Sequence, residues 1–287
     1  MNGKPLVYLD SAASAQKPRA VIAAMTGLME GHYANVHRGL HTLANETTEA
    51  FEKARETVAR FLNAESAEQI VWTKGGTEAI NLVAAGLGPS IKPGDEIVVT
   101  QMEHHANIVP WHMLRERFGA VLKWAPVMDD GVLDMAALAG LIGPRTRLVA
   151  VTHMSNVLGT VTDVRAVADL AHAAGALVLV DGCQGAVHCA PDVQALDADF
   201  YVFTGHKLYG PTGIGGLYGK RAALEALPPY QGGGEMIATV EQDRVTYAGV
   251  PHRFEAGTPP IIEAIGLGAA LDWLSGFDRA TIAAHEQ

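Results

Sequence analysis

A lysine at position 207 combines a reactive side chain with an unusual setting. It lies in residues 203–211 (FTGHKLYGP), directly after an apolar run and before a turn containing glycine and proline. Most lysines are solvated surface residues, and that is the alternative here. A lysine at the end of a buried strand is instead partly desolvated, which favours the neutral amine and makes it a Schiff-base nucleophile. Lys207 is therefore a candidate for binding an aldehyde cofactor.

Pyridoxal phosphate is such an aldehyde, and a protein must also supply an anion for its pyridine nitrogen, a phosphate site and a platform for its ring. Asp181 ends the apolar run 177–181, and a buried carboxylate requires a partner such as a pyridinium. The alternative is an ordinary turn aspartate before Gly182. Residues 75–78 (GGTE) join a strand to a helix, so free backbone N–H groups and the Thr77 hydroxyl are candidates for phosphate binding. Alone, this segment is also a common helix start.

Three further side chains complete the candidate site. Thr204 and His206 flank Lys207 and are placed to add to the phosphate site. His104, in the segment 102–107, is a candidate for stacking on the pyridine ring. The alternative for its pair with His105 is one buried, hydrogen-bonded histidine and one exposed histidine.

The elements that position these residues follow from the apolar pattern. Five short runs are apolar at consecutive positions, which is typical of parallel strands covered on both faces: 70–73, 97–100, 148–152, 177–181 and 200–204. Segments 77–87 and 163–174 have apolar residues at helical spacing. The alternation predicts an α/β fold with a mostly parallel, doubly wound sheet and flanking helices.

In such sheets, ligands bind beyond the carboxyl ends of the strands. Polar or reactive residues follow all five predicted strands, in segments 73–77, 101–107, 153–156, 181–184 and 204–207. The sequence therefore predicts that these five segments form one site.

Composition narrows the class of protein. The 287 residues have 21 basic and 31 acidic side chains and a formal charge of −10, which argues against nucleic acid or an anionic membrane as the main partner. The apolar runs are too short to span a membrane. Residues 1–9 lack the layout of a signal peptide, and two cysteines suit a reducing compartment. A cytoplasmic enzyme is the resulting expectation.

Two other motifs are set aside. Residues 213–220 look like a nucleotide-binding loop, but Ile214 stands where a glycine is required and Arg221 replaces the serine or threonine. His37 and His41 are four positions apart, yet no cysteine or glutamate falls at the spacing of a zinc site. No metal is expected.

Seven stretches in order resemble those of the fold-type I pyridoxal-phosphate enzymes. The resemblance is to the class V aminotransferase branch, and within it to the cysteine desulfurase and selenocysteine lyase group of the SufS/CsdA kind. The stretches are 8–14, 35–41, 103–107, 155–160, 180–184, 205–211 and 253–259.

The resemblance implies roles for the residues around the cofactor ring. Lys207 would bind the cofactor as a Schiff base and later carry the substrate's α-proton. Asp181 would pair with the pyridine nitrogen, and Gln184 would hydrogen-bond the phenolic oxygen. His104 would stack on the ring and relay protons.

It also implies the phosphate and substrate contacts. Thr77, Thr204 and His206 would hold the phosphate. Thr258 would reach the phosphate of a neighbouring subunit, which implies a homodimer with shared sites. Substrate positioning would fall to three residues: Asn156, His37 and Arg38.

The implied reaction converts L-cysteine to L-alanine and transfers sulfur as an enzyme persulfide, with a sulfur-acceptor protein of iron–sulfur cluster assembly as a possible partner. Three alternatives stay open. One is a selenocysteine lyase acting on L-selenocysteine, and another is a related class V reaction such as a transaminase or epimerase. The third is a non-catalytic fragment that binds pyridoxal phosphate.

The resemblance further implies a division of the chain. Residues 1–45 would be an N-terminal segment of the small domain and active-site loop, 46–260 the large cofactor-binding domain, and 261–287 the start of a long helix. The family's C-terminal small domain, with its persulfide cysteine and carboxylate-binding arginine, is expected to lie beyond residue 287. Cys183 is expected to be a buried, inert thiol, and Cys189 lies in no sulfur-acceptor motif of the family.

Overall fold

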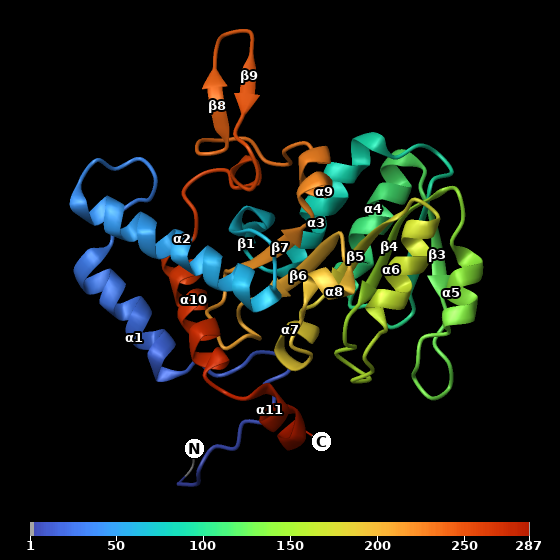
Figure 1. Cartoon of the computed structure of the whole chain (residues 1–287), viewed down its shortest axis with the longest axis horizontal. Helices are drawn as coiled ribbons and strands as arrows, with labels where there is room; N and C mark the ends of the chain where they lie inside the picture. The colour runs from blue at the N-terminus through green and yellow to red at the C-terminus, as the bar shows by residue number, and fades with distance from the viewer. Residues whose placement is uncertain (1–2, 287) are drawn as a thin grey trace.

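A seven-stranded sheet forms the centre of the computed structural model, which describes residues 3–286 (Figure 1). The strand order is β1-β7-β6-β5-β4-β2-β3. β7 is antiparallel to both neighbours, and the other adjacent pairs are parallel. The strands are β1 (Ile70–Thr73), β2 (Glu96–Thr100), β3 (Val121–Ala125), β4 (Thr146–Thr152), β5 (Leu177–Asp181), β6 (Phe200–Thr204) and β7 (Gly215–Gly219).

Helices cover both faces of this sheet, and strand residues alternate between two apolar cores. In β4, Val149 and Val151 join the core that includes α6, whereas Leu148 and Ala150 join the core that includes α3 and α4. The helices around the sheet are α3 (Gly76–Leu87), α4 (Val109–Phe118), α5 (Met135–Leu141), α6 (Val164–Ala173), α7 (Gly185–His188), α8 (Val193–Leu196) and α9 (Arg221–Ala226). The doubly wound α/β prediction is confirmed, as are all five predicted strands and both predicted helices.

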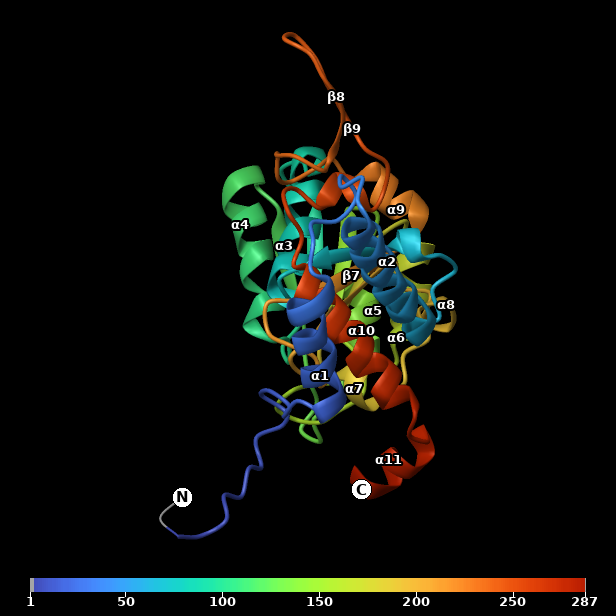
Figure 2. The same cartoon turned by 90° about the vertical axis from the view of Figure 1, so that its left-hand side faces the viewer.

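Helices from the two ends of the sequence pack together beside the β1 side of the sheet. α10 packs against both α1 and α2, so the N-terminal and C-terminal helices form one layer (Figure 2). These helices are α1 (Arg19–Gly27), α2 (Thr42–Leu62) and α10 (Ile261–Ser275), and α11 (Arg279–Glu286) follows α10. α10 begins at the predicted boundary after residue 260, while α2 runs without a break through residues 45 and 46. The three-part division of the chain stays a prediction.

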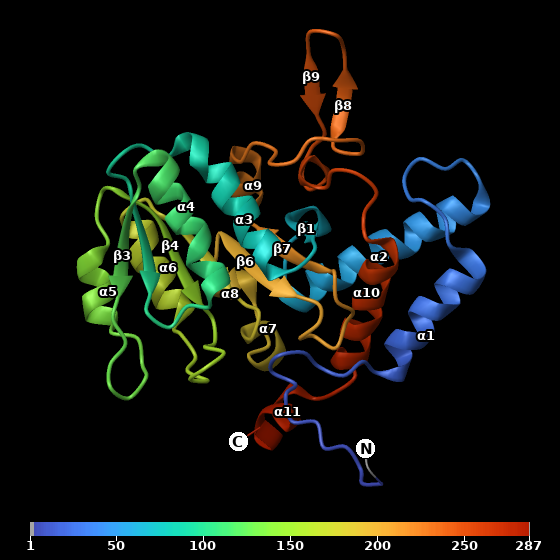
Figure 3. The same cartoon turned by 180° about the vertical axis from the view of Figure 1, so that it is seen from behind.

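The remaining elements are short. β8 (Ile237–Val240) and β9 (Val245–Tyr247) form an antiparallel hairpin that projects from the body of the molecule (Figure 3). A π-helical turn spans Leu28–His32, and four 3₁₀ turns span Ala67–Gln69, Gly88–Ser90, His105–Asn107 and His252–Phe254. Within residues 3–286, no helix is both long and apolar enough to cross a membrane.

The glycine-rich segment 213–220 forms β7 rather than a nucleotide loop. A Cβ atom at Gly216 would lie 2.3 Å from the Phe203 ring, and one at Gly219 would lie 2.6 Å from Leu224. Both distances are far below van der Waals contact, so the glycines allow β7 to pack closely against its neighbours.

A buried ion pair ties the helical layer to the sheet. Arg55 of α2 is 1% exposed and donates from Nη1 and Nη2 to the two carboxylate oxygens of Glu255, at 2.6 and 3.0 Å. Arg55 also donates to the Ile70 carbonyl at 2.9 Å, and Glu255 accepts from the Trp72 N–H at 2.7 Å. Burial alone would raise the pKa of Glu255, but the charge of Arg55, together with hydrogen bonds from His252, Arg55 and the Trp72 N–H, lowers it to about 2. The pair therefore anchors β1 to α2 and to the segment before α10.

Replacing Arg55 by methionine should cost about 3–5 kcal/mol of unfolding free energy, because the buried Glu255 charge would lose its bidentate partner and keep only His252, 3.7 Å away, as an ion-pair partner. Urea unfolding monitored by circular dichroism measures the change. The matched control is Arg60→Met on the same helix, where the side chain is 62% exposed. A surface substitution of that kind should change stability by about 0.5 kcal/mol or less.

The pH dependence of the unfolding free energy tests whether the charge of Glu255 causes this loss of stability. The folded pKa of Glu255 lies near 2, below its usual value of 4.5, so the stabilisation by its charge is complete above pH 4.5 and is lost as pH falls toward 2. In Arg55→Met, protonation of Glu255 instead removes the buried charge that has lost Arg55. The stability gap between the two proteins should therefore narrow as pH falls through this window. A gap that stays constant would show that Glu255 is not the cause.

Candidate active site

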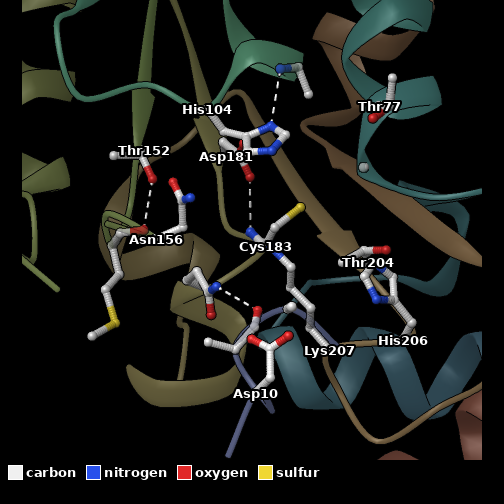
Figure 4. Close-up of a pocket in the computed structure, with 16 residues that line it drawn as sticks. Asp10, Thr77, His104, Thr152, Asn156, Asp181, Cys183, Thr204, His206 and Lys207 are labelled. Carbon is white, nitrogen blue, oxygen red and sulfur yellow. Dashed lines mark hydrogen bonds between the residues drawn. The ribbon is translucent and has the colours of Figure 1, made fainter. Parts of the chain in front are cut away.

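A cavity of about 460 Å³ opens at the carboxyl ends of the parallel strands (Figure 4). All five segments predicted to form one site contribute to its wall. Eight of the predicted site residues line it: Thr77, His104, Asn156, Asp181, Gln184, Thr204, His206 and Lys207. The prediction that these segments converge is confirmed.

Adjacent strands place the acid and the lysine. Asp181 is the last residue of β5 and Thr204 the last residue of β6, and both are buried. One oxygen of the Asp181 carboxylate accepts from the Cys183 N–H at 3.0 Å, and the carboxylate faces the cavity, which Lys207 also lines (Figure 4). A carboxylate and a primary amine thus line the same cavity.

The turn after β5 lies against a buried pair of side chains. A Cβ atom at Gly182 would lie 2.1 Å from the Tyr201 ring, and one at Gly185 would lie 2.4 Å from Nδ1 of His153. The Tyr201 hydroxyl and His153 Nδ1 are 2.9 Å apart. Burial lowers the pKa of His153 to about 4, so its ring is neutral near pH 7 and one hydrogen bond joins it to the Tyr201 hydroxyl. Only glycines allow the turn that carries Asp181 to approach this pair so closely.

The N-terminus of α3 faces the cavity with donor groups. Its N-cap residue is Gly75, so no side chain caps the first N–H groups of this 12-residue helix. The Thr77 and Thr204 side chains line the same region. Burial, together with the charges of Lys207 and Lys17, lowers the pKa of His206. Helix N–H groups, the helix dipole and two hydroxyls form a donor set that suits a phosphate.

His104 and His105 are alike in exposure, unlike the alternative in which one of them is buried. Both His104 and His105 are exposed, so the alternative of one buried and one exposed ring is wrong. His104 caps the following 3₁₀ turn by accepting the Ala106 N–H at 3.1 Å, and its ring lines the cavity. The buried ionisable group of this turn is Glu103.

No residue of the stretch 8–14 was given a site role from the sequence, yet Asp10, Ala12 and Ala13 line the cavity. Gln184 Nε2 donates to the Ala12 carbonyl at 3.0 Å. Lys17 Nζ donates to the His206 carbonyl at 3.2 Å. The segment therefore bridges the turns after β5 and β6. The available signal was the family-like stretch 8–14.

Three residues assigned by resemblance lie outside this cavity. Thr258 lines a smaller cavity of about 90 Å³ that also includes Lys74 and Glu78. His37 lies 2.9 Å from Glu52, measured from Nε2 to Oε1, and lines another cavity of about 280 Å³. Arg38 forms an ion pair with Glu235 at 2.6 Å. In one chain, these residues do not join the eight predicted residues, Lys207 among them, that line the larger cavity.

The thiol of Cys183 lines the cavity but is not activated. Burial and the neighbouring Asp181 charge raise its pKa well above the usual range, despite the opposing charge of Lys207. Burial also raises the pKa of Cys189, with a smaller contribution from Glu286. Because the thiolate is the nucleophile, neither cysteine has the setting of a sulfur acceptor.

Comparison with known proteins identifies the class. The family model described as aminotransferase class V matches residues 7–287. The chain belongs to this family, whose members depend on pyridoxal phosphate. The lysine, carboxylate and helix N-terminus around the cavity agree with that cofactor.

Within the family, the similarity is to cysteine desulfurases. The chain is 57% identical over 288 residues to a cysteine desulfurase of Dickeya dadantii, covering 100% of this chain and 70% of the relative. It matches the structure of the cysteine desulfurase CsdA, in its S-sulfonic acid form, from Escherichia coli with a TM-score of 0.89 and 49% identity, covering 95% and 68% of the two chains. The apo cysteine desulfurase of Thermococcus onnurineus NA1 matches with a TM-score of 0.94 and 39% identity, covering 97% and 70%. The chain is a cysteine desulfurase homologue.

Proposed function

We propose that the cavity around Lys207 binds pyridoxal phosphate and L-cysteine for desulfuration. The observation that carries this proposal is the meeting of Lys207, the buried Asp181 carboxylate and the uncapped N-terminus of α3 in one cavity. These groups come from three separate turns and match the aldehyde, the pyridine nitrogen and the phosphate of the cofactor.

Each group of the cofactor would be bound by different residues of the cavity. Lys207 would bind its aldehyde carbon and Asp181 its pyridine nitrogen. Gln184 uses one N–H for the Ala12 carbonyl, and its amide has a second for the phenolic oxygen. The phosphate would be held by the N–H groups of α3 and three side chains: Thr77, Thr204 and His206. The exposed ring of His104 is the candidate for stacking.

When bound, the cofactor withdraws electrons from the substrate's Cα and so weakens its bonds. The Asp181 carboxylate would support this withdrawal by holding a proton on the pyridine nitrogen. The Lys207 amine would take the Cα proton and later return a proton to the product. Asn156 would orient the substrate within the cavity.

The balanced reaction needs a thiol that accepts sulfur. The C–S bond of L-cysteine breaks, a C–H bond forms at Cβ to give L-alanine, and the sulfur forms an S–S bond with the acceptor as a persulfide. We propose that neither Cys183 nor Cys189 is that acceptor, because their pKa values are raised. The sulfur would be accepted by another thiol, such as that of a sulfur-acceptor protein of iron–sulfur cluster assembly.

L-Selenocysteine is a second candidate substrate. Selenide is a better leaving group than sulfide and makes less demand on an enzyme thiol, which suits a cavity whose own cysteine is not activated. The ratio of alanine formed from the two substrates, with and without an added thiol, distinguishes them.

Replacing Lys207 should remove covalent cofactor binding. With pyridoxal phosphate, the wild-type chain should show a visible absorbance band that borohydride removes and L-cysteine shifts. Both Lys207→Ala and Lys207→Arg should lack it, since arginine keeps the charge but not the nucleophilic amine. With added dithiothreitol, alanine formation should fall at least about 10³-fold in both variants, because the lysine both attaches the cofactor and moves the proton.

Exposed Lys92 provides the control, because Lys92→Ala should keep the band and the activity. Cys183→Ala and Cys189→Ala should also keep alanine formation with added thiol. A band that persists in Lys207→Ala would refute the assignment. A wild-type chain that shows the band but forms no alanine would instead be a non-catalytic cofactor-binding protein.

The position of Thr258 outside the cavity generates a further prediction. We propose a homodimer in which Thr258 contacts the phosphate bound by the other chain. Sedimentation velocity should give twice the 30.3 kDa chain mass. Thr258→Ala should leave the dimer intact and weaken cofactor binding about tenfold or more, as expected for loss of one hydrogen bond to a charged group. A 30.3 kDa species at all concentrations would contradict the proposal.

A further inference from the structure

Glu103 is a buried carboxyl group behind the cavity, and it has no part in the proposed reaction. It lies in the turn between β2 and α4 and is 7% exposed. Its Oε1 accepts from the Thr100 hydroxyl at 2.5 Å and from the Thr152 N–H at 2.9 Å. Its Oε2 accepts from the Asn107 amide at 2.6 Å. One carboxyl group thus receives three donors.

These donors come from three separate parts of the fold. Thr100 is the last residue of β2, and Thr152 is the last residue of the neighbouring strand β4. Asn107 ends the 3₁₀ turn after His104, and its Oδ1 accepts from the Trp111 indole of α4 at 3.1 Å. Glu103 therefore joins two strand ends to the turn and helix that follow His104.

The hydrogen bonds of Glu103 connect it to residues in two walls of the cavity. His104 follows Glu103 directly in the chain and lines one part of the wall. Thr152 also lines the cavity, and its hydroxyl donates to the Met154 carbonyl at 2.9 Å, in the loop that continues to Asn156. The separation between the His104 ring and this loop consequently depends on the bonds that Glu103 accepts.

Keeping a carboxyl group here is costly. Burial raises the pKa of Glu103 to about 8, although its three hydrogen bonds oppose the shift. Burying a polar group costs free energy that its hydrogen bonds must offset, and apolar packing often stabilises a core as well or better. A group retained at such a cost is expected to do more than hold the fold together.

We propose that Glu103 is a positioning residue that fixes the His104 ring relative to the loop of Asn156, so that the cofactor ring fits between the walls of the cavity. This inference rests on the proposed function. Glu103 itself does not line the cavity, so it acts through His104 and Thr152.

The hydrogen-bond pattern allows a specific test by substitution. Oε1 faces the Thr152 N–H, which can only donate. Oε2 faces the Asn107 amide N–H₂, which is held in that orientation because the Trp111 indole can donate only. In Glu103→Gln, the new NH₂ group must therefore face one of two donors. Adding Asn107→Asp removes the conflict, because the new carboxylate accepts from both the amide introduced at position 103 and the Trp111 indole.

The primary measurement is the circular dichroism induced in the visible band of the bound cofactor, which depends on the ring's surroundings rather than on turnover. Glu103→Gln should keep its far-ultraviolet spectrum and covalent cofactor, but lose at least half of the induced signal. Its kcat for L-cysteine should fall about tenfold to a hundredfold with a smaller change in KM, as for a small misplacement of reacting groups.

The double variant Glu103→Gln, Asn107→Asp should return both values to within about threefold of the wild type. In a His104→Ala background, Glu103→Gln should cause little further loss of induced signal, because the two residues act through one ring. If Glu103→Gln fails to fold, Thr100→Val removes one of the three bonds and should give a smaller loss of the same kind.

Three results would overturn the inference. One is an unchanged induced signal in the folded Glu103→Gln variant, and another is a double variant no better than the single one. The third is a wild type that binds no cofactor at Lys207, which would overturn the proposed function as well. Normal cofactor binding with indistinguishable variants would refute the positioning role alone.

Discussion

The site depends on one constraint, which is that the parallel strands are buried on both faces. Side chains of β4, β5 and β6 alternate between two apolar cores, so these strands can carry polar residues only where they end. Because the strands are parallel, those ends share one edge of the sheet. The chemistry-bearing turns therefore meet there, although they are far apart in sequence.

Buried polar groups behind this edge fix the individual turns. The Arg55–Glu255 pair holds β1 through the Ile70 carbonyl and the Trp72 N–H, just before the turn that starts α3. Glu103 likewise holds the ends of β2 and β4 together through its hydrogen bonds. Each group is costly to bury and is satisfied by donors or acceptors from several elements. The apolar cores thus determine where the cavity lies, and these polar links determine how its walls are spaced.

The fold was predictable where local pattern and burial agree. β1, β5 and β6 begin and end at the predicted residues, because each is a continuous apolar run with a polar end. β7 was not predicted, since its glycines resemble a loop until the packing of Phe203 is known. β3 lies at the sheet edge with mostly partly exposed or exposed residues, so it lacks the apolar signal of a central strand.

Much of the site was predictable for the same reason, since its turns follow recognisable strands. The contribution of Asp10 was not, because its segment has no regular structure and is placed by long-range bonds such as those of Gln184 and Lys17. Thr258 was assigned by resemblance, and its distance from the cavity in one chain becomes visible only in three dimensions.

The central claim is that the turns at this edge form a covalent pyridoxal-phosphate site at Lys207. The most direct measurement is peptide mapping by mass spectrometry after borohydride reduction of the wild-type chain with equimolar pyridoxal phosphate. We expect one modified peptide, with the pyridoxyl group on Lys207. Modification spread over exposed lysines such as Lys92, or none at all, would contradict it.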